Sequence, residues 1–307
     1  MEYPVNVSIQ CLVYNHEPYL RQCLDGFVMQ KTNFRFEAII HDDVSTDGSA
    51  DIIREYARKY PEIIKPIYET ENQYSKHDDS LLRVLKKAMT GKYIAICEGD
   101  DYWTDPLKLQ KQVDYLESHP ECALCFHNAI QHWQDGSQPD SPFSELEERD
   151  YTGLEVTENW IIPTASMVYR SSCLPQYETL MKKAKRPFTF GDTPLAAACA
   201  NCGTLHALKD TMSVYRRTPD SFTLRHSAKQ YYATGLSWLE FFRVFGDEYK
   251  PKGIDQAVYN FIMCDFYSLK EHDFRLFFRS FYQSFICHPV TSLKKIAGMI
   301  RERNLSA

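Results

Sequence analysis

The sequence lacks several features that would assign it to a broad class at once. It has no run of eighteen apolar residues, and its N-terminal Met-Glu-Tyr-Pro is not a basic leader followed by an apolar stretch. We therefore expect neither a membrane span nor a signal peptide. Basic residues are not in excess, since 35 Lys and Arg stand against 41 Asp and Glu. Nucleic-acid binders usually carry a basic face, so nucleic acid is not an expected partner.

The ten cysteines do not form the dense framework of a small disulfide-rich protein. They are scattered through apolar stretches such as 93–97, which indicates a reduced, cytoplasmic location. Two pairs, Cys122 with Cys125 and Cys199 with Cys202, have the spacing of zinc ligands. The first pair lies in an apolar strand, where residues three apart face opposite sides, so structural zinc is not favoured.

The first half of the chain alternates apolar runs with helical patterns. This alternation predicts an α/β fold with a doubly wound, mainly parallel sheet flanked by helices. The expected strands are 7–13, 36–40, 64–68 and 93–97, and the expected helices are 18–30, 49–60, 81–89 and 104–119. Ligands in such folds bind beyond the carboxyl ends of the strands, so the informative residues should directly follow strands.

The second half is less regular. Residues 134–150 are polar and rich in turn formers, which indicates a surface excursion. We expect an α/β domain over 1–229 and a C-terminal helical appendage over 230–307. That appendage has aromatic residues at helical spacing, namely Phe274, Phe277, Phe278, Phe281 and Phe285. The stripe fits a core between helices, and it also fits a peripheral membrane contact or a homo-oligomer contact.

An acidic cluster, Glu98-Gly-Asp-Asp101, follows the expected strand 93–97. Three carboxylates within four residues repel one another unless a cation neutralises them. Mg²⁺ and Mn²⁺ take oxygen ligands of this kind and bridge to substrate phosphates. A solvated acidic turn with a helix cap explains the same residues, so the tetrapeptide alone leaves both interpretations open.

Two other polar segments also follow strands. In 42–48, Asp43 lies several residues before the next helix, so hydrogen bonding to a base or ribose explains it better than helix capping does. Its neighbours Thr46 and Asp47 fit turn and N-cap roles. After the first strand, the ring of Tyr14 can stack on a base and Glu17 can meet a polar edge, although a loop tyrosine is commonly only packing.

Together these segments closely resemble glycosyltransferase family 2. The resemblance covers 5–127 almost throughout, and the run 100–111 is especially similar to bacterial members that build surface polysaccharides. It rests on three spaced motifs in the expected order: Tyr14-Asn, Ile39-Ile-His-Asp-Asp-Val-Ser-Thr-Asp-Gly-Ser49 and Gly91-Lys-Tyr-Ile-Ala-Ile-Cys-Glu-Gly-Asp-Asp101. The resemblance implies a GT-A fold. It also implies inverting transfer of a sugar from a nucleotide-diphosphate donor, expected to be UDP-linked, to an acceptor hydroxyl.

The resemblance also implies roles for individual residues. Residues 1–127 would hold the nucleotide sugar, and 128–229 would supply the acceptor site and the catalytic base. The metal motif, which would hold Mn²⁺ or Mg²⁺, matches Asp101 as direct ligand, with Asp100 and Glu98 beside it. Glu98 stands where the motif often has an aspartate. The residues matched to donor binding are Leu12, Tyr14, Glu17, Asp43, Lys76, Asp100 and Arg216.

The resemblance further assigns the general base to Asp192, in a Gly-Asp pair. A carboxylate there would accept the proton of the attacking hydroxyl, although Asp192 also fits an N-cap for a helix over 194–200. The chain departs from the family where many members carry Ala-Arg-Asn before the metal strand. Lys76 or His77 is then a candidate for the basic diphosphate contact, and so is Arg216 or its neighbour Arg217.

Two other functions fit parts of the pattern. A nucleotidyltransferase would share an acidic metal site, but it normally carries a Gly-rich basic loop near the first strand, and 14–17 has no glycine. A catalytically inactive sugar-nucleotide binder or assembly partner is the non-enzymatic alternative, against which the intact Asp43, Asp101 and Asp192 argue. By resemblance, the acceptor would be a saccharide or a lipid-linked saccharide. The expected location is cytoplasmic, or peripheral at the inner face of the cytoplasmic membrane.

Overall fold

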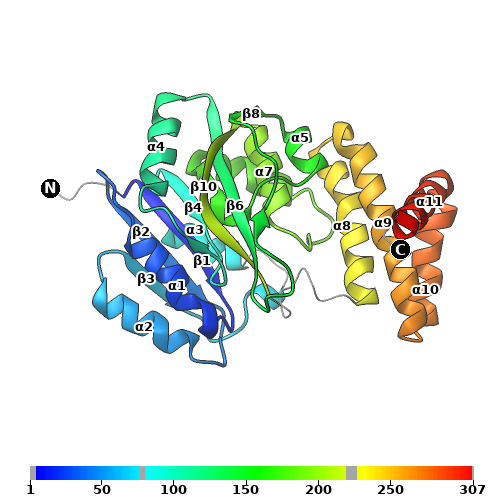
Figure 1. Cartoon of the computed structure of the whole chain (residues 1–307), viewed down its shortest axis with the longest axis horizontal. Helices are drawn as coiled ribbons and strands as arrows, with labels where there is room; N and C mark the ends of the chain where they lie inside the picture. Colours follow the sequence, from blue (N-terminus) through cyan, green and yellow to red (C-terminus); the bar gives the residue numbers. More distant parts are fainter. Residues whose placement is uncertain (1–4, 77–79, 219–226, 306–307) are drawn as a thin grey trace. The chain divides into compact units, whose positions relative to one another are not determined.

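A computed structural model describes residues 5–76, 80–218 and 227–305. The chain divides into two compact units, the first made of 1–177 and 198–218 and the second of 178–197 and 219–307. The predicted diphosphate contact at His77 lies outside the described residues. Figure 1 shows the sheet and its helices in the first unit and a set of helices in the second.

The first unit is built on a mixed sheet. Its strand order is β3-β2-β1-β4-β9-β6-β10-β5, with β7 beside β6 and β8 beside β10. Four pairs of neighbours run parallel: β1 with β2, β1 with β4, β2 with β3, and β6 with β10. Strands β9 and β5 run antiparallel to their neighbours. The strands are β1 (Val7–Val13), β2 (Phe36–Asp42), β3 (Ile64–Tyr68), β4 (Tyr93–Ile96), β5 (Tyr102–Trp103), β6 (Cys122–Trp133), β7 (Ser141–Pro142), β8 (Arg149–Tyr151), β9 (Val168–Arg170) and β10 (Thr204–Arg217).

The helices pack on this sheet through apolar faces. In α1, Leu20, Leu24 and Phe27 are fully buried, and they join the alternate inward residues of β1 in one core. All four residues of β4 are buried, as expected for a central strand covered on both faces. The helices are α1 (Glu17–Val28), α2 (Ser49–Lys59), α3 (Ser80–Ala88), α4 (Lys108–Ser118), α5 (Gly153–Glu158), α6 (Leu174–Met181) and α7 (Asp192–Ala200), the last two running from one unit into the other.

Two local features differ from the sequence-based expectation. Helix α4 begins at Lys108 rather than near Thr104, because Thr104 donates its N–H to Met212 O and the chain still runs beside β10. Asp105 Oδ1 accepts from Leu107 N at 2.7 Å in the turn that follows. The polar segment 134–150 lies at the surface, as expected, but it also contains β7 and reaches β8, both of which pair with the sheet.

The second unit is helical after residue 227. It contains α8 (Ala228–Phe245), α9 (Lys250–Lys270), α10 (Phe274–Phe281), a π-helical segment (Tyr282–Ile286) and α11 (Pro289–Leu305). Its interior is aromatic: the ring of Phe241 stacks on Phe245 at 4.6 Å and meets Tyr249 edge-on at 5.2 Å. Among the described residues, no helix has both the length and the apolar character that crossing a bilayer requires.

Candidate donor-binding and catalytic site

Three parallel neighbouring strands end at one edge of the sheet. In the register, Val13 at the end of β1 lies beside Asp42 at the end of β2, and β4 lies on the other side of β1. The segments that follow these strands begin with Tyr14, Asp43 and the run Cys97–Asp101. The structure therefore brings together the three motifs that the sequence placed far apart, at the edge where ligands bind in such folds.

The loops after β1 and β2 are locked to one another. Asn15 N donates to Ser45 Oγ at 3.0 Å, and Thr46 N donates back to Asn15 Oδ1 at 2.7 Å. Gly48 N donates to Glu17 Oε2 at 2.7 Å, and Glu17 N donates to Asp47 Oδ2 at 3.0 Å. The Glu17 carboxylate thus holds the start of α2, and its predicted contact with the ribose stays a prediction.

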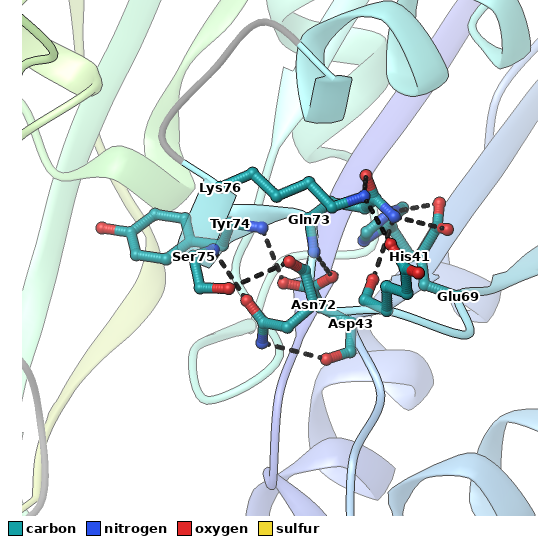
Figure 2. Close-up of polar contacts among 9 residues, drawn as sticks. His41, Asp43, Glu69, Asn72, Gln73, Tyr74, Ser75 and Lys76 are labelled. Carbon is teal, nitrogen blue, oxygen red and sulfur yellow. Dashed lines mark hydrogen bonds and ion pairs between the residues drawn. The ribbon is translucent and has the colours of Figure 1, made fainter.

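Asp43 sits in a cradle of backbone N–H groups, which Figure 2 shows. Its Oδ1 accepts from Gln73 N at 2.6 Å and its Oδ2 from Tyr74 N at 3.0 Å, while Asn72 Nδ2 reaches its carbonyl oxygen at 3.2 Å. The residue is only 5% exposed. A carboxylate oxygen has two lone-pair directions, so each oxygen can still accept a hydrogen bond from a ligand.

The backbone beside Asp43 is strained. Val44 has a φ of 66°, and Asn15, in the facing loop, has a φ of 56°. Asparagine tolerates this left-handed region, but a β-branched residue there is a genuine outlier. Strain of this kind persists where the surroundings enforce it, and it clusters at functional sites. The loop after β2 therefore has the backbone signature of a binding loop as well as the side chains.

Lys76 belongs to the same cluster as Asp43. Its Nζ donates to Gln73 Oε1 at 3.0 Å and forms an ion pair with Glu71 Oε2 at 3.0 Å (Figure 2). The Gln73 amide in turn donates to Glu69 Oε2 at 3.1 Å. Lys76 therefore braces the segment that holds Asp43, and its predicted contact with the donor diphosphate stays a prediction.

Asp101 is the buried member of the acidic cluster, at 3% exposure. Its Oδ1 accepts from Arg216 N at 2.9 Å, which ties the loop after β4 to β10. Burial, followed by the nearby charges of Asp100 and Glu98, raises the pKa of Asp101 well above its usual range. A cation placed beside these carboxylates would favour the ionised form of Asp101 and lower its pKa.

Arg216 is buried beside this cluster, at 5% exposure. Its guanidinium lies over the rings of Tyr102, at 4.5 Å, and Tyr19, at 5.3 Å, and it donates to Gln22 Oε1 and to Gln134 Oε1. Its Nε has no hydrogen-bond partner among the described residues. A fixed cation with a spare donor can bind an anionic group of a ligand.

The carboxylates can serve a divalent cation only together with another oxygen source. No group of three or more His, Cys, Asp or Glu side chains in the described part of the chain is arranged to hold a metal ion. Mg²⁺ and Mn²⁺ sites are commonly built from one or two carboxylates plus phosphate oxygens and water. The acidic neighbours of Asp101, and the raised pKa of Asp101 itself, fit such a shared site.

The remaining predicted residues take the following places. Leu12 accepts a hydrogen bond from Gly99 N at 3.0 Å through its carbonyl oxygen, so it fixes the acidic loop through its backbone. The Tyr14 side chain is half exposed at the strand end. Asp192 begins α7 in the second unit, and its Oδ1 accepts from Thr193 N at 2.7 Å. The role of Asp192 as base stays a prediction from resemblance.

Sequence reasoning missed Tyr74 and its neighbour Gln73. Their backbone N–H groups hold Asp43, and the Tyr74 ring is 54% exposed. Burial, and then the charge of Glu98, raise the pKa of Tyr74, so the charge of the acidic loop acts on this side chain. An exposed aromatic ring in a polar segment after the short strand β3 was the available signal.

Comparison with known proteins identifies the family. The sequence model described as Glycosyl transferase family 2 matches residues 8–172, more than half of the chain. The chain belongs to this family. An uncharacterized protein of Mycobacterium tuberculosis is 42% identical over 214 residues, which is 69% of this chain and 58% of that protein. The putative teichuronic acid biosynthesis glycosyltransferase TuaG of Bacillus subtilis is 32% identical over 134 residues, 44% of this chain and 50% of that protein.

Solved structures share the fold. Staphylococcus aureus TarS 1–349 in complex with UDP-GlcNAc superposes with a TM-score of 0.59 at 15% identity, covering 83% of this chain and 71% of that chain. The mannosyltransferase PcManGT of Pyrobaculum calidifontis, in complex with GDP-Man and Mn²⁺, gives a TM-score of 0.60 at 15% identity and covers 99% and 81%. The predicted family and the predicted GT-A type fold with C-terminal helices are confirmed. The chain spans just over half the length of the mycobacterial relative.

Proposed function

We propose that this protein is an inverting glycosyltransferase that moves a sugar from a nucleotide-diphosphate sugar to an acceptor hydroxyl. The observation that carries the proposal is the convergence of Tyr14, Asp43 and the Glu98–Asp101 run at the ends of three parallel strands. The fold neighbours bound to UDP-GlcNAc and to GDP-Man support a nucleotide-sugar donor.

In this proposal the donor base lies against Asp43 and the ring of Tyr14. Asp43 accepts from a ring N–H, as uracil offers, and we therefore propose a UDP-linked donor. The buried cation Arg216 and the basic Lys76 face the diphosphate. Leu12 and Glu17 fix the loops around the base and ribose, and Asp100 completes the ribose side.

The acidic run would hold Mn²⁺ or Mg²⁺, with Asp101 as direct ligand and Asp100 and Glu98 beside it. When bound, the cation would stabilise the charge that develops on the departing nucleoside diphosphate. The high pKa of Asp101 supports this, because a nearby positive charge favours the ionised carboxylate. The Mn²⁺ in the mannosyltransferase neighbour supports the same choice of ion.

Asp192 would act as general base. As the acceptor oxygen attacks the anomeric carbon, its proton would pass to the Asp192 carboxylate, and one direct displacement inverts the configuration. We propose that the acceptor is a saccharide or lipid-linked saccharide of a bacterial surface polysaccharide or glycan. The likeness to TuaG supports this class of pathway.

A nucleotide panel tests the proposal. With Mn²⁺ present, one nucleoside diphosphate should raise the melting temperature, and the matching nucleotide sugar should be hydrolysed slowly or transferred to an added acceptor. Stabilisation without turnover of any donor would favour an inactive sugar-nucleotide binder. Release of pyrophosphate from a nucleoside triphosphate and a sugar phosphate would favour a nucleotidyltransferase. No response to any nucleotide would contradict all three.

A further inference from the structure

Helix α10 and the π-helical segment after it bury polar side chains and expose aromatic ones, the reverse of an ordinary surface helix. Their fully buried side chains are small and polar: Ser280 Oγ donates to Phe261 O at 2.6 Å, and Ser284 Oγ donates to Asp265 Oδ2 at 3.3 Å. In contrast, Phe278 is 68% exposed. Soluble proteins bury phenylalanine far more often than serine. The face that these residues present to solvent is therefore the apolar one.

The exposed apolar side chains form one strip, the aromatic strip, along this helical stretch. Positions four apart lie on one face of a helix, and the rings of Phe277 and Phe281 lie 5.9 Å apart, those of Phe281 and Phe285 4.7 Å apart. The exposed members of the strip are Phe274, Phe278, Phe281, Tyr282 and Ile286. At 1.5 Å per residue the strip is about 20 Å long, far more than a single scattered surface hydrophobe.

Two exposed arginines border the strip. Arg275 and Arg279 each lie one position, about 100° around the helix, beyond Phe274 and Phe278. Long basic side chains at the edge of an apolar face can cover it with their stems while the charged ends reach lipid phosphates. The adjoining helices repeat the combination, with exposed Phe266, Leu269 and Lys270 in α9 and exposed Val290, Leu293 and Lys294 in α11.

The charge of this region is opposite to that of the protein as a whole. Residues 266–299 contain five Lys and Arg against two Asp and Glu, whereas the whole chain carries a net charge of −6. A surface that is aromatic and locally basic on an acidic protein complements an anionic lipid bilayer. A two-fold contact between copies would instead gather four arginines, two from each copy, around one apolar interface, where like charges repel.

We propose that the aromatic strip is a membrane-binding surface that lies in the interface of an anionic lipid bilayer. The strip binds without spanning: its phenylalanine rings enter the boundary between headgroups and acyl chains, and its arginines meet the phosphates. This binding does not depend on the proposed transferase activity, because it uses only residues of the second unit.

Vesicle sedimentation of the full chain tests the proposal. Binding to phosphatidylcholine vesicles that contain roughly 30 mol% phosphatidylglycerol should be at least about tenfold stronger than binding to vesicles of phosphatidylcholine alone. Binding to the anionic vesicles should weaken as the salt concentration rises from roughly 0.1 to 0.5 M. Phe274→Ser/Phe278→Ser should lower binding roughly tenfold by removing inserted rings. Arg275→Glu/Arg279→Glu should lower it by a similar or larger factor, and only on anionic vesicles.

A matched charge reversal in the first unit is the control. Lys31→Glu/Lys87→Glu changes the net charge by the same amount at two exposed positions and should leave vesicle binding unchanged. All variants should keep the melting temperature and the nucleotide-dependent stabilisation of the parent, because the altered side chains are exposed. This separates loss of membrane binding from failure of the proposed function.

Three outcomes overturn the proposal. The first is binding of the parent protein to anionic vesicles no stronger than to neutral ones. The second is a loss of binding in the control variant as large as that in the arginine variant, which would indicate a general charge effect. The third is a dimer in analytical ultracentrifugation that the phenylalanine variant converts to monomer in the absence of vesicle binding, which would assign the strip to a second copy of this chain.

Discussion

The backbone N–H of Arg216 donates a 2.9 Å hydrogen bond to Oδ1 of Asp101. This bond crosses 115 residues of sequence and holds a buried carboxylate in place while leaving its second oxygen for another partner. If Asp101 is a metal ligand, as proposed, this bond fixes it in advance, so that little conformational freedom would be lost when the cation and the donor bind.

The first prediction concerns the charge of Asp101. Asp101→Asn keeps an oxygen that can accept from Arg216 N, but it removes the carboxylate charge. We expect Mn²⁺-dependent binding of the nucleoside diphosphate to weaken at least about tenfold, by loss of one ligand charge. The melting temperature without metal should stay the same or rise, because a carboxylate raised in pKa by burial is costly to ionise.

Isothermal titration with and without Mn²⁺ measures the first effect, and thermal denaturation measures the second. Asp105→Asn, just beyond β5, provides a matched control, since Asp105 pairs with Lys111 at 2.9 Å. Equal metal-dependent affinity in Asp101→Asn and the parent protein would rule out Asp101 as a ligand.

The second prediction concerns the cradle around Asp43. Asp43→Asn replaces one acceptor oxygen by an NH₂ group, so the N–H of either Gln73 or Tyr74 loses its partner. An unsatisfied buried donor costs about 1–3 kcal/mol. We expect the free energy of unfolding to fall by about that amount and nucleotide affinity to fall with it.

Asp42→Asn is the comparison, because Asp42 Oδ1 accepts one long 3.3 Å bond, from Ser45 N. Urea unfolding and nucleotide titration should both show a smaller change for this variant. If the two variants behave alike in both measurements, the cradle has no special role.

Much of the fold could be predicted from the sequence because its signals are local. Buried apolar runs and amphipathic helices repeat through the first half, and the expected strand 7–13 is β1 as observed. The start of α4 could not be predicted, because Thr104 and Pro106 read as a cap and first turn. Thr104 N instead donates to Met212 O, a residue 108 positions later in the sequence, and this bond holds the chain beside β10.

The candidate site shows the same division. Asp43 directly follows β2, and Asp101 closes the acidic run after β4, so their placement followed from the strand pattern and the resemblance. The contact of Tyr74 with Asp43 could not be recognised, because it is made by a backbone N–H that donates to a carboxylate 31 residues earlier. Glu17 was matched to the ribose, yet its hydrogen bond to Gly48 N depends on how two loops meet. Contacts made by the backbone leave no mark on residue type.

The third prediction concerns the exposed ring of Tyr74. Tyr74→Ala keeps the backbone N–H to Asp43 but removes the ring next to the acidic loop. If the ring contacts the donor nucleotide, affinity should fall about fivefold or more, since an aromatic–base contact contributes about 1–3 kcal/mol. Tyr74→Phe should retain most of the affinity. Fluorescence titration compares both with Tyr68→Ala, a similarly exposed tyrosine on β3, and equal losses at the two positions would contradict a specific role.

The fourth prediction concerns Asp192. Asp192→Asn retains an oxygen that can accept from Thr193 N, so the start of α7 and the melting temperature should be preserved. As general base, the residue should contribute about 10²–10⁴ in rate, so kcat should fall by that factor while donor affinity is unchanged. Steady-state transfer and nucleotide titration measure the two quantities. Transfer at the parent rate would remove Asp192 from this role.

The last prediction concerns a buried lysine that the proposed mechanism does not use. Lys108 Nζ donates to Gln112 Oε1 at 2.8 Å and lies 4.1 Å from the centre of the Trp103 ring. Burial lowers the pKa of Lys108 to about 7, although nearby thiols oppose the shift. In the unfolded chain its pKa is near 10.5. Between these two values the unfolded state binds the extra proton, so stability rises with pH across that window and has no slope from Lys108 below it.

Lys108→Met should remove this slope, which is at most about 1.4 kcal/mol per pH unit for one proton. Urea unfolding in a reducing buffer at several values between roughly pH 6 and 10 measures it. The folded structure also shifts the pKa of thiols, lowering that of Cys173 to about 7 and raising that of Cys97 to about 11, so the difference between the variant and the parent isolates Lys108, whereas the raw slope does not. The exposed Lys31→Met should leave the slope intact. A Lys108→Met curve parallel to that of the parent would mean that the lysine reaches water in the folded state and titrates normally there.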